Sequence, residues 1–162
     1  MIALQITETK AFMSKLLASP VFDTFLLQEA SLQTAISYVI DGHINHAFYQ
    51  SDEEAPLAGT DFIPYGDVRS TLFSLIKGKR TPLSLQVVLQ LSSSQSAMLF
   101  PEGLDAHLIK GLLLNIRFDG ARAYITSGIS YYSFSLDKAP ELIWDEALIT
   151  LLRGAGIAFE QL

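Results

Sequence analysis

The residues whose types could bind a metal are Asp41, His43 and His46, in the run "DGHINH". A metal site requires that such side chains converge on one point. On a strand His43 and His46 would point to opposite faces, and on a helix the useful spacing of a histidine pair is i, i+4. The spacing therefore predicts no metal site and favours histidines exposed on a hairpin.

Carboxylates that could do acid–base chemistry gather near the end of the chain, at Asp137, Glu141, Asp145 and Glu146. General acid–base catalysis needs two carboxyl groups that converge and have shifted pKa values. Successive helical residues diverge by about 100°, so Asp145 and Glu146 do not converge. The pattern favours a solvated helix face. The chain also lacks a nucleophile elbow, a phosphate-binding glycine loop and a dinucleotide fingerprint, so we expect no catalytic residue and no cofactor.

The aromatic run "SYYSF" (130–134) would place Tyr131 on one face of a strand and both Tyr132 and Phe134 on the other. Exposed aromatic side chains can stack on nucleic-acid bases. Aromatic residues favour strands in any case, so the run predicts ordinary sheet packing.

Positive charge is concentrated in one set of residues, although the chain has 11 Lys and Arg against 17 Asp and Glu and a net charge of -6. Such a chain repels phosphate backbones on average, so nucleic-acid binding would require cations segregated on one face. The set lies on two predicted helices and their flanks: Lys10, Lys15, Arg69, Lys77, Lys79 and Arg80. The same residues could instead complement the helix dipoles, by about 0.3–1 kcal/mol each. Both interpretations stay open.

The composition indicates one compact domain, since 49% of the 162 residues are hydrophobic and only 17% are charged. A chain of this length buries roughly 70% of its unfolded surface. The absence of cysteine excludes disulfides, thiolate metal sites and cysteine nucleophiles. No signal-like start and no apolar run near ~18 residues is present. We therefore expect a soluble, cytoplasmic protein with no membrane contact.

Hydrophobic periodicity predicts the elements of the first two thirds of the chain. They are a strand at 2–6, a helix from Thr7 or Thr9 to Pro20, a bend near 31–34, a hairpin at Asp41-Gly42 that pairs 34–40 with 43–49, an acidic surface loop at 51–61, a helix from Asp67 to Gly78, a strand at 83–91 and a short helix capped by Ser92.

The last third reads as a three-stranded meander followed by a helix. The strands are expected at 112–118, 121–127 and 129–136, with turns at Asp119-Gly120 and Ser127-Gly128. The stripe of Trp144, Leu148, Leu151 and Leu152 predicts a final helix over about 138–154.

The two longer helices repeat the same apolar stripe. Met13, Leu16 and Leu17 precede Leu72, Leu75 and Ile76 by a constant 59 positions (72 − 13, 75 − 16, 76 − 17). We expect one domain over 1–162, built from two similar halves at about 1–60 and 61–136 and followed by the final helix.

The segment "MIALQITETKAFMSKLLASPVFDTFLL" resembles the opening strand and first helix of a DNA sliding-clamp domain. The segment "DVRSTLFSLIKGKRTPLSLQVVLQLS" resembles the second clamp helix and the strand that follows it. In clamps the paired helices present Lys and Arg to DNA, so the resemblance implies that role for the six cations. The whole chain, including "FSLIKGKRTPLS" and "SLDKAPELIWDEAL", also resembles an uncharacterised bacterial protein family of unknown function.

The sequence therefore predicts an α+β fold: a mainly antiparallel sheet with two packed helices, in a duplicated βαβββ unit like that of a sliding clamp, plus a C-terminal helix. Another two-layer α+β sandwich is the alternative. We expect a non-catalytic binding or adaptor protein with a protein partner. The alternatives are a nucleic-acid-associated protein that uses the basic helix face and an enzyme whose site is assembled from distant residues. An adaptor should expose an apolar patch, which we expect around Ile157, Ala158 and Phe159.

Overall fold

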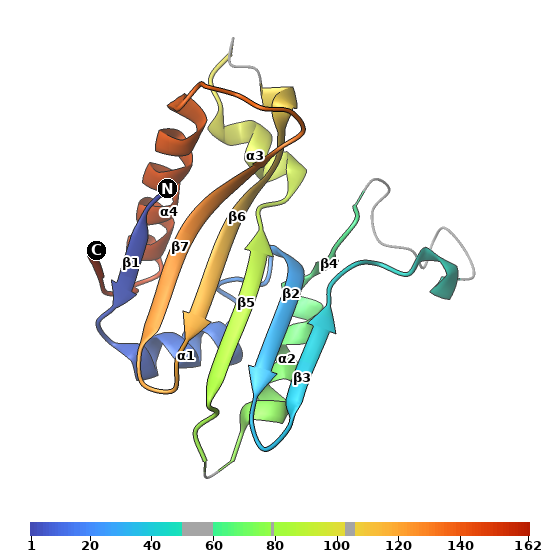
Figure 1. Ribbon diagram of the computed structural model, residues 1–162, viewed down its shortest axis with the longest axis vertical. Coiled ribbons are helices and arrows are strands. Elements are labelled where there is room, and N and C mark those ends of the chain that lie inside the picture. The colour runs from blue at the N-terminus through green and yellow to red at the C-terminus, as the bar shows by residue number, and fades with distance from the viewer. Residues whose placement is uncertain (50–59, 79, 103–105) are drawn as a thin grey trace.

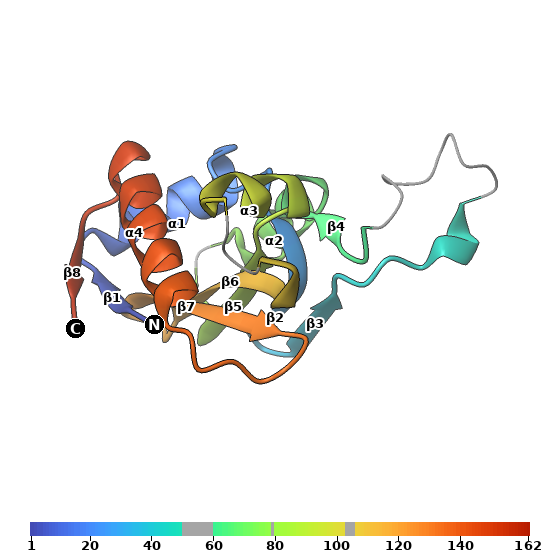
Figure 2. The same ribbon diagram turned by 90° about the horizontal axis from the view of Figure 1, so that it is seen from above.

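The chain folds as an α+β structure in which one antiparallel sheet carries its helices on a single side (Figures 1 and 2). The computed structural model describes residues 1–49, 60–78, 80–102 and 106–162. The predicted fold class, with its mainly antiparallel sheet and C-terminal helix, is confirmed. Most of the predicted acidic loop at 51–61 lies outside the described residues.

Strands and helices are interspersed along the chain. The strands are β1 (Ala3–Ile6), β2 (Leu26–Gln33), β3 (Ser37–Asp41), β4 (Ile63–Pro64), β5 (Ser84–Gln90), β6 (Ile109–Phe118), β7 (Ala123–Tyr131) and β8 (Phe159–Gln161). The helices are α1 (Thr9–Ala18), α2 (Tyr65–Ile76), α3 (Ser93–Leu99) and α4 (Ala139–Gly154), with single 3-10 turns at His46–Phe48 and Ala106–Leu108.

The strand order is β3-β2-β5-β6-β7-β1-β8, and the short β4 also pairs with β2. Every pairing between these named strands is antiparallel. The neighbouring strands β2 and β5 follow the helices α1 and α2, respectively. The element order strand–helix–strand therefore occurs twice, as β1–α1–β2 and β4–α2–β5.

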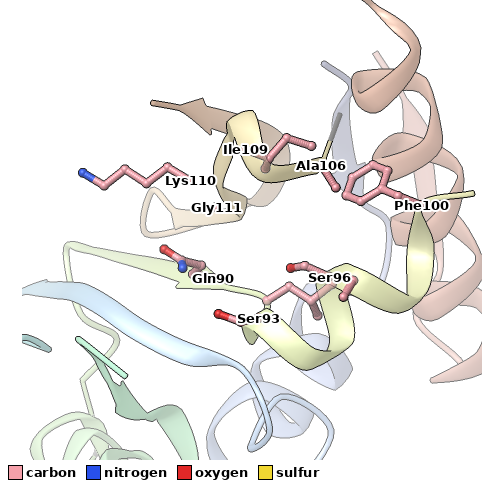
Figure 3. Close-up of a pocket in the computed structure, with 10 residues that line it drawn as sticks. Gln90, Ser93, Ser96, Phe100, Ala106, Ile109, Lys110 and Gly111 are labelled. Carbon is pink, nitrogen blue, oxygen red and sulfur yellow. The ribbon is translucent and has the colours of Figure 1, made fainter. Parts of the chain in front are cut away.

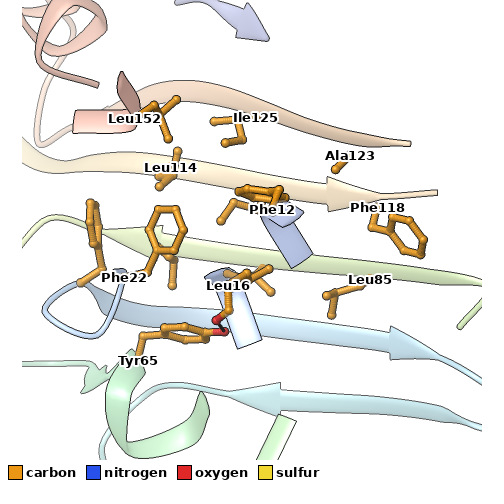
Figure 4. Close-up of a cluster of buried hydrophobic side chains, with 14 of the residues drawn as sticks. Phe12, Leu16, Phe22, Tyr65, Leu85, Leu114, Phe118, Ala123, Ile125 and Leu152 are labelled. Atoms are coloured by element: carbon orange, nitrogen blue, oxygen red, sulfur yellow. Dashed lines mark hydrogen bonds between the residues drawn. The ribbon is translucent and has the colours of Figure 1, made fainter. Parts of the chain in front are cut away.

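The core lies between the sheet and the helices because successive residues of a strand point to opposite faces, and the apolar side chains of the central strands gather on the helix side. Leu85, Val87 and Leu89 of β5 are buried, whereas Gln86 between them is exposed on the other face. The register sets Val87 opposite Ile116 of β6, so neighbouring strands add to one apolar layer. Phe12 and Leu16 of α1 press onto this layer (Figure 4).

The helix pair α1–α2 packs on this layer through apolar side chains and one buried polar contact. Leu16 and Leu17 of α1 and Leu72 of α2 are buried. Tyr65 at the start of α2 is fully buried, and its hydroxyl donates a 2.8 Å hydrogen bond to the carbonyl oxygen of Leu16. Burial raises the pKa of this hydroxyl. The two helices therefore lie side by side over one sheet.

The predicted hairpin at Asp41-Gly42 is wrong. Residues after Gly42 do not pair back with β3; His43 instead bridges Phe62, and β3 pairs with β2 through a turn at Thr34–Ile36. Gly42 is buried because the backbone of β2 approaches it closely, next to the bulge between Leu27 and Glu29. The glycine therefore reflects close approach of two backbones, and the bend expected near 31–34 is the turn that follows β2.

The predicted meander is correct in its first turn and wrong in its second. Asp119 accepts hydrogen bonds from the backbone N–H groups of Ala121 and Arg122, and Gly120 has a φ of +97°, as a tight turn requires. Gly128, however, lies inside β7, which continues to Tyr131 because the long strand β6 supplies partners up to that point. The expected third strand at 129–136 does not form as a separate element.

Several local signals are confirmed. Ser92 caps α3 by accepting a hydrogen bond from the N–H of Gln95. The strand expected at 83–91 is β5, the strand at 2–6 is β1, and α1 ends before Pro20. These elements depend on short-range patterns, which explains why the sequence predicts them well.

We predict that Gly42→Ala strongly destabilises the protein. A Cβ atom at this position would lie 1.7 Å from the carbonyl oxygen of Leu27, so the backbone of β2 must move. Overpacking of this kind costs typically 1–3 kcal/mol, and we expect at least about 2 kcal/mol here because the obstacle is backbone. Urea unfolding of the two proteins measures the difference.

Gly128→Ala is the matched control, since its Cβ would make an ordinary 3.7 Å contact with Leu113. We expect a change of less than about 1 kcal/mol. If Gly42→Ala were as stable as the control variant, the close approach of β2 to Gly42 would be incorrect.

Candidate functional site

The six cations predicted from the sequence do not form one free basic surface. Lys10 of α1 is exposed, and so are Lys77 and Arg80, which follow α2. Lys79 lies outside the described residues. The other two, Lys15 and Arg69, contact groups of the protein itself.

Arg69 is bound by a carboxylate that sequence analysis did not single out. Its Nε atom lies 2.7 Å from Asp23 Oδ1, and its second terminal nitrogen lies 3.1 Å from Asp23 Oδ2. Both side chains are about three-quarters buried. The pair joins α2 to the turn that follows α1, and a longer contact reaches the carbonyl oxygen of Leu17. Arg69 therefore stabilises the packing of the two helices.

Lys15 contacts the end of another helix. Its Nζ atom donates a 2.5 Å hydrogen bond to the carbonyl oxygen of Ala155, just after α4. The last carbonyls of a helix carry partial negative charge and have no partner within the helix, so a lysine there is stabilising. The second sequence interpretation, cations that complement helix ends, thus describes Lys15, which lies in the last turn of α1 and also binds the end of α4.

A groove on the open face of the sheet is lined by Asp41 and His43, two of the three residues whose types could bind a metal. Its volume is about 290 Å³, and its lining includes Glu29, Asp41 and His43. His43 Nδ1 lies 2.6 Å from Asp41 Oδ1. The backbone N–H of His43, and then its ring, lower the pKa of Asp41. Both side chains are more than 60% exposed, so the groove does not shield them from water.

His46 does not join this groove, and no cluster of three or more metal-ligating side chains occurs among the described residues. Nor does any helix in the described part of the chain have the length and apolar character needed to cross a bilayer.

A second hollow of about 180 Å³ lies between α3 and the start of β6 (Figure 3). Phe100, Ala106 and Ile109 supply apolar walls, while Ser93, Ser96 and Gln90 supply polar groups. Lys110 contributes the one charged side chain of its lining. This hollow can hold a few water molecules. No pair of acidic or basic side chains converges in it.

The carboxylates expected on a solvated face of α4 are arranged differently. Asp145 is only 8% exposed. Its carboxylate accepts a short hydrogen bond from the hydroxyl of Ser127 in β7 and lies 3.1 Å from the amino group of Met1. The solvated-face prediction is therefore wrong for Asp145, because α4 packs on β7 with this residue turned inward.

The largest deviation from expectation is a stretch of exposed apolar side chains between β7 and α4. Tyr132, Phe134 and Leu136 are 71%, 87% and 82% exposed, and Leu142 in the first turns of α4 is 65% exposed. We call these four residues the apolar loop surface. In Figure 1 the loop crosses the top of the molecule from the end of β7 to the start of α4.

The loop is held at both ends by hydrogen bonds. The N–H of Tyr132 donates to the carbonyl oxygen of Leu108 at 2.8 Å. Asp137 accepts from the N–H of Ala139 at 2.9 Å, and its own N–H donates to Ser135. The loop surface is thus positioned by the fold.

Sequence analysis missed this surface because alternation of aromatic residues and serine imitates a strand. The sheet-packing prediction is wrong for Tyr132 and Phe134. The feature that ends β7 is the length of its partner strand, β6. Tyr131 pairs with Ile109, the first residue of β6, so the residues after Tyr131 have no strand beside them. The apolar patch expected at 157–159 is also wrong, because Ile157 is 4% exposed.

We predict that Arg69 and Asp23 are coupled in stability. A double-mutant cycle with Arg69→Ala and Asp23→Ala should give a coupling of about 1–3 kcal/mol, since the two hydrogen bonds are charge-assisted and partly buried. Urea unfolding of the four proteins measures the coupling.

The exposed pair Lys138–Glu141, with a 3.3 Å contact at i, i+3 spacing, is the control. We expect its coupling to stay below about 0.5 kcal/mol. An equal coupling in the two cycles would show that Arg69 is no more a structural residue than Lys138.

Comparison with known proteins identifies the chain at the level of a family. Residues 15–160, from α1 to β8, match a family described as a family of unknown function, DUF5721. No curated protein and no solved structure matches the chain. The resemblance to sliding clamps therefore stays a prediction from sequence pattern. Because the match spans nearly the whole chain, the protein belongs to the family of unknown function DUF5721.

Proposed function

We propose that this protein is a non-catalytic binding module whose partner is another protein, and that the apolar loop surface contacts the partner. The observation that carries the proposal is the exposure of Tyr132, Phe134, Leu136 and Leu142 within one short stretch of chain. A single exposed apolar residue is ordinary, whereas four on one short segment favour an interaction surface.

The residue types and their support favour a protein partner. Aromatic residues are enriched at the centres of protein interfaces, and burial of a Phe or Leu side chain contributes about 1.5–3 kcal/mol. Hydrogen bonds at Tyr132 and Asp137 order the two ends of the loop. A loop with ordered ends loses less conformational entropy on binding, which favours affinity.

The remaining surfaces support catalysis less well. The Asp41–His43 pair is mostly exposed, so water competes for both groups. The hollow beside α3 is small and has Lys110 as its one charged side chain. An acid–base catalyst needs groups whose pKa values are tuned by partial burial, and neither hollow offers a converging pair of that kind.

The test compares the proteins that co-purify with tagged wild-type protein and with the variant Tyr132→Ser/Phe134→Ser/Leu136→Ser, in cells of the source organism. We expect a partner that wild type enriches and that the variant loses at least tenfold. Because the three side chains are exposed, each substitution should change the free energy of unfolding by less than about 0.5 kcal/mol.

The control variant is Phe48→Ser/Leu83→Ser/Met98→Ser. Its three side chains are 81%, 70% and 84% exposed but lie on other parts of the fold. This variant should retain the partner. Equal loss in both variants, or full retention in the loop variant, would contradict the proposal.

Nucleic-acid association through the basic helix face is the second candidate. It is favoured by the side-by-side packing of α1 and α2 and by the exposure of Lys10, Lys77 and Arg80. It is weakened by the internal contacts of Lys15 and Arg69.

Electrophoretic binding to duplex DNA at 50 and 200 mM salt tests this second candidate. A protein that makes several phosphate contacts binds much more weakly at the higher salt. Under our proposal no complex forms at either concentration. Salt-sensitive binding that Lys77→Glu/Arg80→Glu abolishes would instead support the nucleic-acid function.

A further inference from the structure

We propose that two copies of this chain associate through β3, which pairs antiparallel with β3 of the second copy about a two-fold axis at Val39. This inference does not depend on the apolar loop surface. Its starting point is that β3 ends the strand order and pairs with β2 alone among the described strands. Figures 1 and 2 show β3 at the outer edge of the sheet, with β8 at the other edge in Figure 2.

Among the described residues, this edge has little of the usual protection against another strand. Its one charged side chain is Asp41, at the end of β3. Natural edge strands are blunted by lysine, proline, bulges or a covering element. The run Ile36–Asp41 reads "ISYVID", with neither lysine nor proline, and its pairing with β2 is regular from Glu29 to Gln33. Ile36 and Val39 are 61% and 67% exposed. The edge is therefore chemically suited to accept a strand.

The hydrogen bonds on the inner side of β3 determine which backbone groups face outward. The N–H of Gly42 donates to Gln28, and the N–H of Thr34 donates to Ile36. In an antiparallel ladder these bonds alternate, so Tyr38 and Ile40 direct their N–H and C=O groups toward β2. Ser37, Val39 and Asp41 direct theirs toward the open edge.

With a two-fold axis at Val39, all of the outward N–H and C=O groups find a hydrogen-bond partner in the second copy. Val39 then pairs with the second Val39, and Ser37 pairs with Asp41 of the other copy, so each outward residue meets an outward residue. No like charges stand opposite one another. On the helix side, half-buried Tyr38 faces Ile40 of the other copy, and both become more buried. The strand is thus complementary to its own inverted copy.

Charge at the end of β3 favours the same orientation. Asp41 ends the strand, and the carbonyl oxygen of the nearby Asp61 accepts from the N–H of Ile44. Antiparallel pairing keeps these acidic ends of the two copies apart, which limits repulsion between two chains of net charge -6.

The opposite edge explains why association should stop at two copies. β8 has three residues and carries Glu160, so it is a poor template for another strand. A symmetric contact that uses the same strand on both copies is closed. A dimer is expected, and not a filament.

The test uses the absence of cysteine in the chain. In the variant Val39→Cys the two sulfurs would lie across the axis, and opposed residues of an antiparallel pair are about 5.5 Å apart at Cα, within disulfide range. Mild oxidation should convert most of the protein to a covalent dimer. Gln86→Cys, exposed on the same face of an interior strand, should form no disulfide-linked dimer under the same treatment.

Analytical ultracentrifugation gives the independent measurement. Wild type should sediment with twice the mass of the 17.8 kDa chain at micromolar concentration. Val39→Lys should raise the dimer dissociation constant at least tenfold, and circular dichroism checks that it remains folded. Ile36→Lys, at the edge of the pairing, serves as a second variant with a smaller effect.

A wild-type chain that stays monomeric at high micromolar concentration, without a Val39→Cys cross-link, would overturn the proposal. So would a dimer that Val39→Lys leaves intact, since another surface would then join the copies. Occupation of β3 by a strand of a different protein, with no self-association, would overturn it as well.

Discussion

The fold depends on one apolar layer that is buried between a single sheet and the helices on one of its faces. A sheet that is buried on one face must keep its register, because a shift of one residue turns every apolar side chain to water. Val87 opposite Ile116, with Phe12 and Leu16 above them, fixes that register at the centre. The other face of the sheet is mostly polar and carries no helix. The two edge strands, β3 and β8, need not resemble each other.

The constraint extends to the polar contacts. Packing of α1 and α2 on the same apolar layer takes the hydroxyl of Tyr65 and the guanidinium of Arg69 largely out of water. Both groups then need hydrogen-bond partners, which Leu16 and Asp23 provide. An unpartnered group at such a position would cost about 1–3 kcal/mol. The positive charge that gives the helix region its basic character is therefore partly a requirement of packing.

The sequence predicts the parts of the fold that local patterns determine. Alternation over 84–90, the serine cap of α3 and the Asp119-Gly120 turn are all visible within a few residues. It fails where a residue is chosen for something distant in the chain. Gly42 is small because Leu27 approaches it, Asp145 is buried because it meets Ser127, and Tyr132 lacks a strand because β6 has already ended. The apolar loop surface belongs to this second group, since its residues imitate a strand that has no neighbour.

The position of β1 has a consequence for the order in which the protein folds during synthesis. β1 is made before the other strands of the sheet, yet Gln5 pairs with Tyr124 and Glu160, so its place in the sheet forms only after β7 and β8 have been made. At roughly 5–20 residues per second that delay is on the order of 10 s. The hairpin β2–β3 can close early, whereas β1 keeps its apolar residues unpaired until β7 has been made. The nascent chain is therefore most exposed to misassembly after β1 and before β7 have left the ribosome.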